Sequence, residues 1–126
     1  MAIVPHDFIQ NRADFHTVLA ELIDETRKLV AGSPGFPPYG VILRQLEAID
    51  RWTSTGLDPS KDDRKSIDMG LVIVRELEPA ADPVAYRFNA RVSELGWYLK
   101  HWRSDADWQA LDDDDDDIYD PDEHAP

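Results

Sequence analysis

The sequence contains no cysteine. This absence excludes a scaffold held by disulfides, a thiol nucleophile and a zinc site built from cysteine ligands. It is typical of proteins in a reducing compartment, so we expect a cytoplasmic location. A chain of 126 residues is long enough to bury a hydrophobic core without such crosslinks.

Long apolar runs are also missing. No segment approaches the roughly 20 apolar residues that a membrane-spanning helix requires. The opening residues, MAIVPHDFIQ, lack the basic start and the apolar centre of a secretory signal. We therefore expect neither a membrane span nor a secretory signal.

Basic residues are scarce, and the formal net charge at pH 7 is −13. Residues 105–126 contain eleven acidic residues and no lysine or arginine, whereas residues 1–104 contain fifteen acids and thirteen bases, a formal charge of −2. The sequence thus predicts a folded domain over 1–104 and an acidic C-terminal extension over 105–126. Because acidic extensions repel nucleic acid and anionic membranes and attract basic proteins, we expect a protein partner with a basic surface.

Four segments carry apolar residues at helical spacing, which predicts four amphipathic helices. They span residues 14–30, 39–52, 63–76 and 83–102. The stretches AGSPGFPP and EPAADP break the pattern between them, and Asp82 before Pro83 is typical of a helix start. Four helices with short connections predict an all-α fold, a small antiparallel helical bundle.

The apolar stripes predict the core. In the last helix the stripe consists of Val84, Phe88, Val92, Leu95, Leu99 and Trp102. In the third it consists of Ile67, Leu71 and Val74, and in the second of Val41, Ile42, Gln45, Leu46, Ile49 and Trp52. Each stripe must be buried against the others.

One segment allows a second interpretation. GLVIVREL, residues 70–77, is rich in β-branched residues and is compatible with a strand. The chain offers no second strand of similar quality to pair with it, so we favour a helix.

Residues that carry chemistry do not form a recognisable catalytic pattern. The four histidines lack the spacing of a helical zinc site, the glycines form no phosphate loop, and no serine lies in a nucleophile elbow. Glu76 and Glu78 are paired acids, but solvated acids are common at helix ends. The aspartate run 112–117 lacks the spacing of a calcium-binding loop. We expect no enzymatic activity, no cofactor and no specific metal site.

Aromatic residues gather toward the end of the last helix. Trp97, Tyr98 and Trp102 lie within six residues, and Trp108 follows. One interpretation is that Trp102 and a neighbour complete the core. The other is that an exposed aromatic residue anchors a protein interface, since Trp97 and Trp102 are five residues apart and cannot face the same way.

Two stretches, FPPYGVILRQLEAIDRW and IDMGLVIVRELEPAADPVAYRFNARV, carry a resemblance to a known family. Over about residues 35–92 the chain resembles small helical bacterial immunity proteins. The founding member of that family protects a bacterium against a type VI secretion effector that destroys NAD(P)⁺. The shared features are a proline-rich entry, a QL helix, a G-hydrophobic-REL helix and a DP start to the last helix. The resemblance implies a cytosolic all-α protein that binds and blocks a cognate toxin, with no catalytic residues to carry over.

The composition is compatible with that class for separate reasons. A small acidic domain without a catalytic constellation suits a stoichiometric inhibitor, and opposite charge speeds capture of a basic toxin. We therefore expect an immunity protein that binds and inhibits a cognate toxin. An adaptor or effector-specific chaperone that binds a basic protein without inhibiting it remains the alternative.

The acidic extension is the predicted binding segment. Acidic runs are commonly solvated ends, but Trp108, Leu111, Ile118 and Tyr119 add apolar surface that a solubilising end does not need. We expect residues 108–123 to dock on a basic surface of the partner. The predicted partner-binding residues are Trp108, Asp112, Asp113, Asp114, Asp115, Asp116, Asp117, Tyr119 and Asp120.

Overall fold

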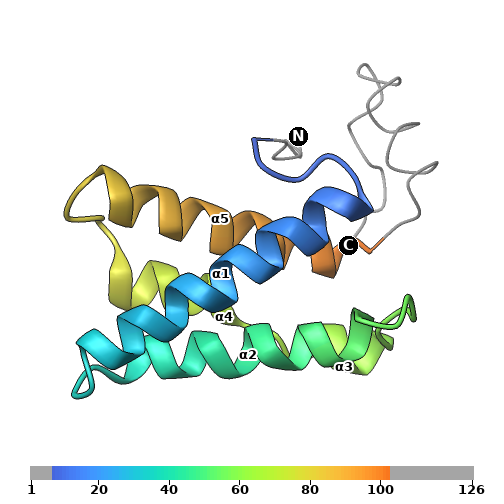
Figure 1. The fold of residues 1–126 in the computed structure, drawn as a ribbon, viewed down its shortest axis with the longest axis horizontal. Coiled ribbons are helices and arrows are strands. Elements are labelled where there is room, and N and C mark those ends of the chain that lie inside the picture. The colour runs from blue at the N-terminus through green and yellow to red at the C-terminus, as the bar shows by residue number, and fades with distance from the viewer. Residues whose placement is uncertain (1–6, 103–126) are drawn as a thin grey trace, which may run out of the picture.

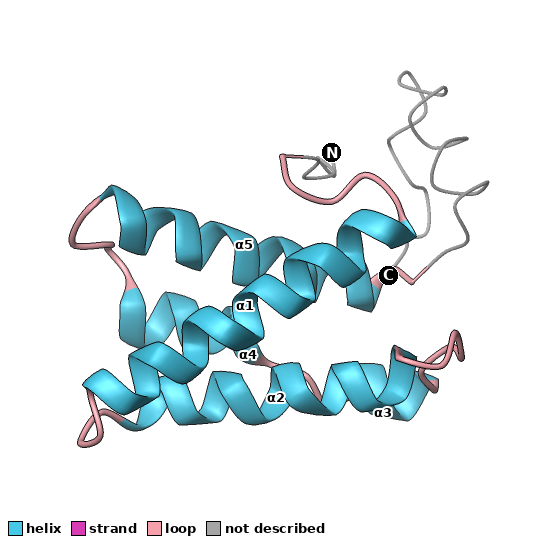
Figure 2. Ribbon diagram, in the orientation of Figure 1, coloured by secondary structure: helices cyan, strands magenta, loops and turns pink. Residues whose placement is uncertain are grey.

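Helices make up most of residues 7–102, the part of the chain that the computed structural model describes (Figures 1 and 2). In chain order they are α1 (Arg12–Gly32), α2 (Pro37–Thr53), α3 (Lys61–Lys65), α4 (Met69–Val72), the π-helix η1 (Ile73–Leu77) and α5 (Pro83–Lys100). Residues 7–102 contain no strand, so the all-α prediction is confirmed and the strand interpretation of residues 70–77 is wrong.

The helix starts follow local capping chemistry. The side-chain oxygen of Asn11 accepts a hydrogen bond from the Asp14 amide at 2.7 Å, and that of Asp82 accepts one from the Ala85 amide at 2.8 Å. Pro83 occupies the first turn of α5, where the N–H that it lacks has no partner within the helix. The predicted start at Asp82 is therefore confirmed.

The predicted third helix, residues 63–76, is interrupted. Between α3 and α4 the amide of Asp68 donates to Oε1 of Gln45 at 2.9 Å, while Nε2 of Gln45 donates to Oδ1 of Asp68 at 2.6 Å. This two-bond clamp from α2 stabilises the break between α3 and α4. Gln45, predicted to lie on the core-facing stripe, instead serves as this polar clamp.

The long segments run back and forth and enclose one core. Figure 1 shows α1 lying across α2 and α5, with α4 behind it. The buried apolar side chains come from every helix except α3, and also from Ile9 before α1. Phe88 and Leu95 are 3% and 0% exposed, so their predicted core positions are confirmed.

Three predicted core residues are exposed instead. Leu71 and Val74 are 48% and 59% exposed, because the helix restarts at Met69 and the π-helical turn changes its phase, so Met69 and Ile73 point inward. Val84 is 72% exposed in the first turn of α5, and the buried stripe of that helix begins only at Phe88.

Candidate functional site

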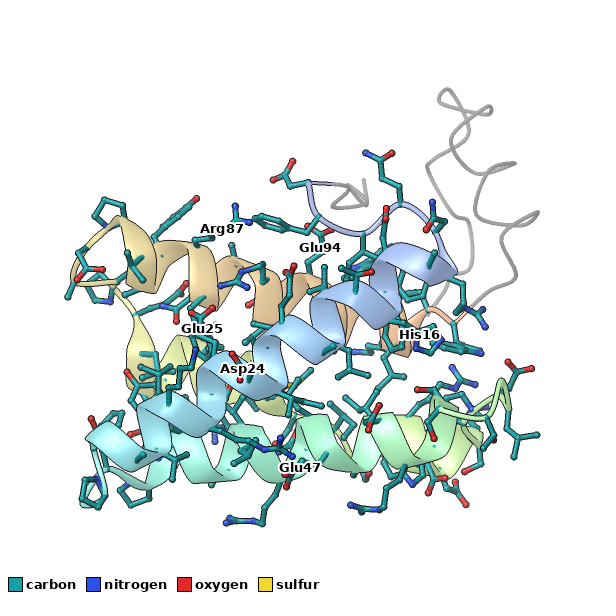
Figure 3. The ribbon with its side chains drawn as sticks, viewed as in Figure 1. His16, Asp24, Glu25, Glu47, Arg87 and Glu94 are labelled. Atoms are coloured by element: carbon teal, nitrogen blue, oxygen red, sulfur yellow. The ribbon has the colours of Figure 1, made fainter. Side chains whose placement is uncertain are left out.

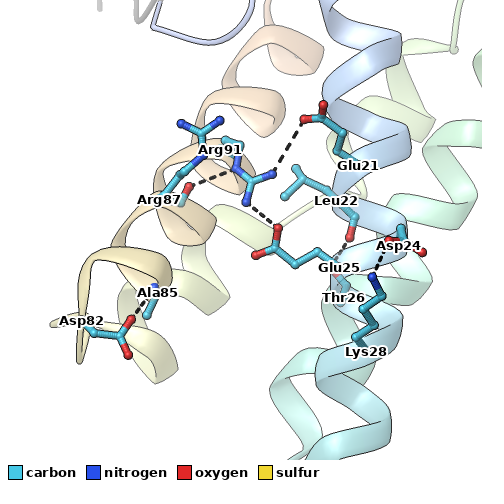
Figure 4. Close-up of polar contacts among 10 residues, drawn as sticks. All are labelled: Glu21, Leu22, Asp24, Glu25, Thr26, Lys28, Asp82, Ala85, Arg87 and Arg91. Carbon is cyan, nitrogen blue, oxygen red and sulfur yellow. Dashed lines mark hydrogen bonds and ion pairs between the residues drawn. The ribbon is translucent and has the colours of Figure 1, made fainter.

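A buried arginine joins α1 to α5. The Arg91 side chain is 7% exposed; its Nη2 lies 2.5 Å from Glu25 Oε1, and its Nη1 lies 3.9 Å from Glu21 Oε1 (Figure 4). Its Nε donates to the carbonyl of Arg87 at 3.4 Å. The guanidinium is thus surrounded by acceptors, as a buried cation requires. The arrangement joins the two helices through one buried cation.

A buried carboxylate holds the segment before α1. Glu94 is 4% exposed, and one of its oxygens accepts hydrogen bonds from the amides of Phe8 at 2.9 Å and Ile9 at 2.6 Å. Figure 3 shows Glu94 on α5 beneath that segment. The acceptor is therefore committed to backbone structure, and Ile9 is inserted into the core.

The end of α5 forms an aromatic cluster. The guanidinium of Arg12 lies 3.7 Å from the centre of the Trp102 ring, and Trp102 Nε1 donates to Asp58 Oδ1 at 2.8 Å. Tyr98 is 1% exposed and stacks on Phe15 with ring centres 5.2 Å apart. Tyr98 therefore belongs to the buried core, whereas Trp102 is partly buried and packs against it.

The described histidines have ring contacts. His16 packs edge-on against Phe15, and the His101 ring lies 4.1 Å from that of Trp97, which is partly buried. Among residues 7–102, no group of three or more histidines and acids is placed to hold a metal ion. His6 and His124 lie outside the described residues.

The chain forms an acid-rimmed pocket at the opposite end of α5. It has a volume of about 430 Å³ and is bordered by Glu25, Glu76, Glu78 and Asp82. Its apolar walls include Leu29, Phe36, Tyr39, Val84 and Phe88. Tyr86, 70% exposed, lines the adjoining hollow with Glu78 and Asp82. We call the pocket and Tyr86 together the acidic end.

The acidic end combines features that recognise basic protein segments. Carboxylates at the rim attract lysine and arginine, and the apolar walls accept their aliphatic parts. Sequence reasoning did not find it, because its residues come from α1, α2, η1, α5 and two loops. The exposed acids Glu76 and Glu78 were the only signal, and they were interpreted as a solvated helix end.

The predicted binding residues Trp108, 112–117, Tyr119 and Asp120 all lie outside the described residues. The predicted boundary between 1–104 and 105–126 also falls there. These predictions therefore remain predictions.

Comparison with known protein families gives a match over most of the described residues. A family model described as Tsi6 matches residues 16–96, more than half of the chain, and no curated protein or solved structure matches. Within residues 7–102, no helix has both the length and the apolar character needed to cross a membrane. The matched residues extend from α1 well into α5 and include the region 35–92 whose resemblance the sequence indicated. The chain belongs to the Tsi6 family of type VI secretion immunity proteins, the family of immunity to the NAD(P)⁺-glycohydrolase effector Tse6.

Proposed function

We propose that this immunity protein neutralises its cognate effector by binding one-to-one and covering the effector's active site. The family match is the observation that carries the proposal. Immunity proteins are generally non-enzymatic, and a binder acts by occupancy. The effector proposed here cleaves NAD(P)⁺, as the family's named effector does.

The acidic end is the part of the bundle that we propose to face the effector. Tyr86 is exposed and amphipathic, and residues of this kind dominate the binding energy of protein interfaces. Glu78 and Asp82 line the same hollow as Tyr86, so a lysine or arginine of the effector finds opposite charge near the apolar walls of the pocket. We propose that a basic segment at the mouth of the effector's active site occupies this pocket.

The acidic extension is proposed to add a second contact. Residues 108–123 would pair their aspartates with lysine and arginine near the active-site mouth, with Tyr119 as the apolar anchor. Long-range attraction from this charge speeds association more than it tightens the complex. In this proposal the helical bundle provides the rigid part of the interface, and the acidic extension increases the rate at which the effector associates.

Inhibition stoichiometry tests the proposal. The toxic domain of the cognate effector is titrated with the full-length immunity protein while NAD(P)⁺ hydrolysis is followed. We expect activity to fall linearly to zero near one equivalent, and co-expression to restore growth. Protection at amounts far below equimolar would indicate turnover by an enzyme, and binding without inhibition would indicate a chaperone or adaptor.

Two variants with a matched control test the surface. Tyr86→Ala should weaken effector binding tenfold or more, which corresponds to about 1.4 kcal/mol. Glu76→Lys should weaken it as well, whereas Asp50→Lys makes the same charge change at another exposed position and should have a smaller effect. Equal effects of the two lysine variants would place the interface elsewhere.

A further inference from the structure

A second hollow lies where the short helices meet α5. It has a volume of about 580 Å³. The lining residues are Lys61, Arg64, Lys65, Ile67, Asp68, Gly70, Leu71, Ser93, Gly96, Trp97 and Lys100. We call it the basic groove. It lies on a different set of residues from the acidic end, with no lining residue in common.

Four cations border the basic groove without an acidic partner among the described residues. Within residues 7–102, no acid lies within ion-pair distance of Lys61, Arg64, Lys65 or Lys100, although Arg91 and other bases are paired. Among the described residues of the lining Asp68 is the single acid, and its side chain accepts the hydrogen bond from Gln45. The groove is therefore strongly positive in a chain whose net charge is −13.

Arg64 fixes the position of these charges. Its Nη1 donates to the carbonyl of Lys100 at 3.2 Å, which ties α3 to the end of α5. Its Nε is buried and has no hydrogen-bond partner in the part of the chain that the structure describes. Arg64 is thus held against Lys100, two residues before Trp102, the last described residue.

The floor of the groove is apolar and open. Trp97 is only partly buried, Leu71 is 48% exposed, and a Cβ added at Gly70 would meet nothing within 4 Å. The exposed Leu71 and the partly buried Trp97 next to lysines are complementary to a segment in which apolar residues are followed by acids. This order is the order of residues 108–117, where Trp108 and Leu111 precede six aspartates.

We propose that the basic groove binds the chain's own C-terminal segment in the absence of effector. Trp108 and Leu111 lie on the apolar floor, and aspartates of 112–117 lie against the lysines. Residues 103–126 begin three residues after Lys100, and the six residues from Trp102 to Trp108 can span about 20 Å when extended. A short tether gives an effective concentration on the order of millimolar, so even weak pairing is populated.

Docking in the groove occurs in the free protein and does not depend on the proposed effector contact, whereas its release by effector rests on that contact. Docking satisfies four cations at once and covers the aromatic floor. An effector with a basic surface competes with the groove for the same aspartates. The C-terminal segment then leaves the basic groove when the effector binds. The groove is thus an intramolecular binding site that the segment occupies only in the free protein.

The absence of cysteine allows a direct test on the full-length protein. Ala110→Cys introduces a single thiol for a nitroxide spin label, and nuclear magnetic resonance measures broadening of each backbone amide without any effector. We expect strong broadening around residues 61–71 and 93–100, and little at the acidic end. Broadening should decrease at high salt, because salt screens the attraction between the aspartates and the lysines, over about 10 Å at 0.1 M ionic strength and over shorter distances above it.

A charge variant with a matched control identifies the contact. Lys61→Glu/Lys65→Glu should remove most of the broadening, whereas Arg44→Glu/Arg51→Glu, the same charge change on exposed residues of α2, should leave it largely intact. The spectra also report whether each variant is folded. Broadening that is absent, equal on all faces or equally reduced by both variants would overturn the proposal.

Mixing separates the chain's own segment from that of a second copy. When spin-labelled protein without ¹⁵N is mixed with unlabelled ¹⁵N protein, we expect no broadening of groove amides. Broadening in the mixture would show that a second copy supplies the segment, and the intramolecular proposal would be wrong.

Discussion

Arg91 on α5 and Glu25 on α1 are 66 positions apart in sequence, and their charged groups lie 2.5 Å apart with the arginine side chain almost fully buried. Glu25 is itself 30% exposed, so water still reaches the acid. The pair therefore has an asymmetry: the acid can be rehydrated if it loses its partner, whereas the buried cation cannot.

Removing the acid should consequently be costly. Glu25→Ala leaves Arg91 with the carbonyl of Arg87 and with the Glu21 carboxylate at 3.9 Å, and we expect a loss of about 2–3 kcal/mol in the free energy of unfolding, measured with urea. The double variant Glu25→Ala/Arg91→Met should cost less than the sum of the two single variants, because methionine fills the space without a charge. Asp24→Ala, in an exposed pair with Lys28, is the control and should change stability by less than about 0.5 kcal/mol. If the loss of stability in the double variant equalled the sum of the two single losses, Glu25 and Arg91 would not be energetically coupled.

The apolar stripe of α5 gives a prediction about packing. Phe88→Ala and Leu95→Ala should each cost about 2–5 kcal/mol, because both side chains are buried and the cavity left behind collapses only partly. Val84→Ala removes a residue from the same predicted stripe, but it is 72% exposed and should cost less than about 0.5 kcal/mol. Thermal or urea unfolding of the three variants tests this ranking, which a large loss for Val84→Ala would reverse.

Glu94 gives a prediction about local stability. Glu94→Ala leaves the part-buried amide of Phe8 and the buried amide of Ile9 without their acceptor, so we expect a loss of about 1.5–3 kcal/mol. Hydrogen exchange at those two amides should accelerate more than exchange in the middle of α2. Ser93→Ala, at the partly buried neighbouring position, is the control. Uniform acceleration along the chain would show that Glu94 acts on global stability alone.

Much of the fold was predictable because it depends on patterns among residues that are close in sequence. Caps such as Asp82, the proline-rich breaks and the stripe through Phe88 and Leu95 are properties of neighbouring residues. The third helix was predicted poorly, because its interruption includes a clamp between Gln45 and Asp68, which are 23 positions apart. A periodic pattern of apolar residues cannot reveal a contact between distant residues. For the same reason it did not predict the π-helical turn that begins at Ile73.

The candidate surfaces were less predictable than the fold. The acidic end draws on residues between Glu25 and Asn89, and the basic groove on residues between Lys61 and Lys100. Both surfaces owe their charge to folding, which brings together like-charged side chains from different segments. Within one segment acids and bases are mixed, as in KDDRK of α3, so the local sequence shows no excess of either charge. Net charge by region therefore located the acidic extension and missed both surfaces of the bundle.

The acidic extension yields the last prediction, which concerns the effector. A protein shortened to end at Arg103 loses eleven acidic residues, so its affinity for the effector at low salt should be lower than that of the full-length protein. Its affinity should also depend less on salt, since exposed charge pairs are screened over about 10 Å at 0.1 M. Tyr119→Ala should weaken binding at both salt concentrations, because an apolar anchor is not screened. Titration calorimetry with the effector at two ionic strengths measures all three proteins. If the shortened protein binds and protects as well as the full-length one, the extension contributes nothing to immunity, and recognition rests on the bundle and its acidic end.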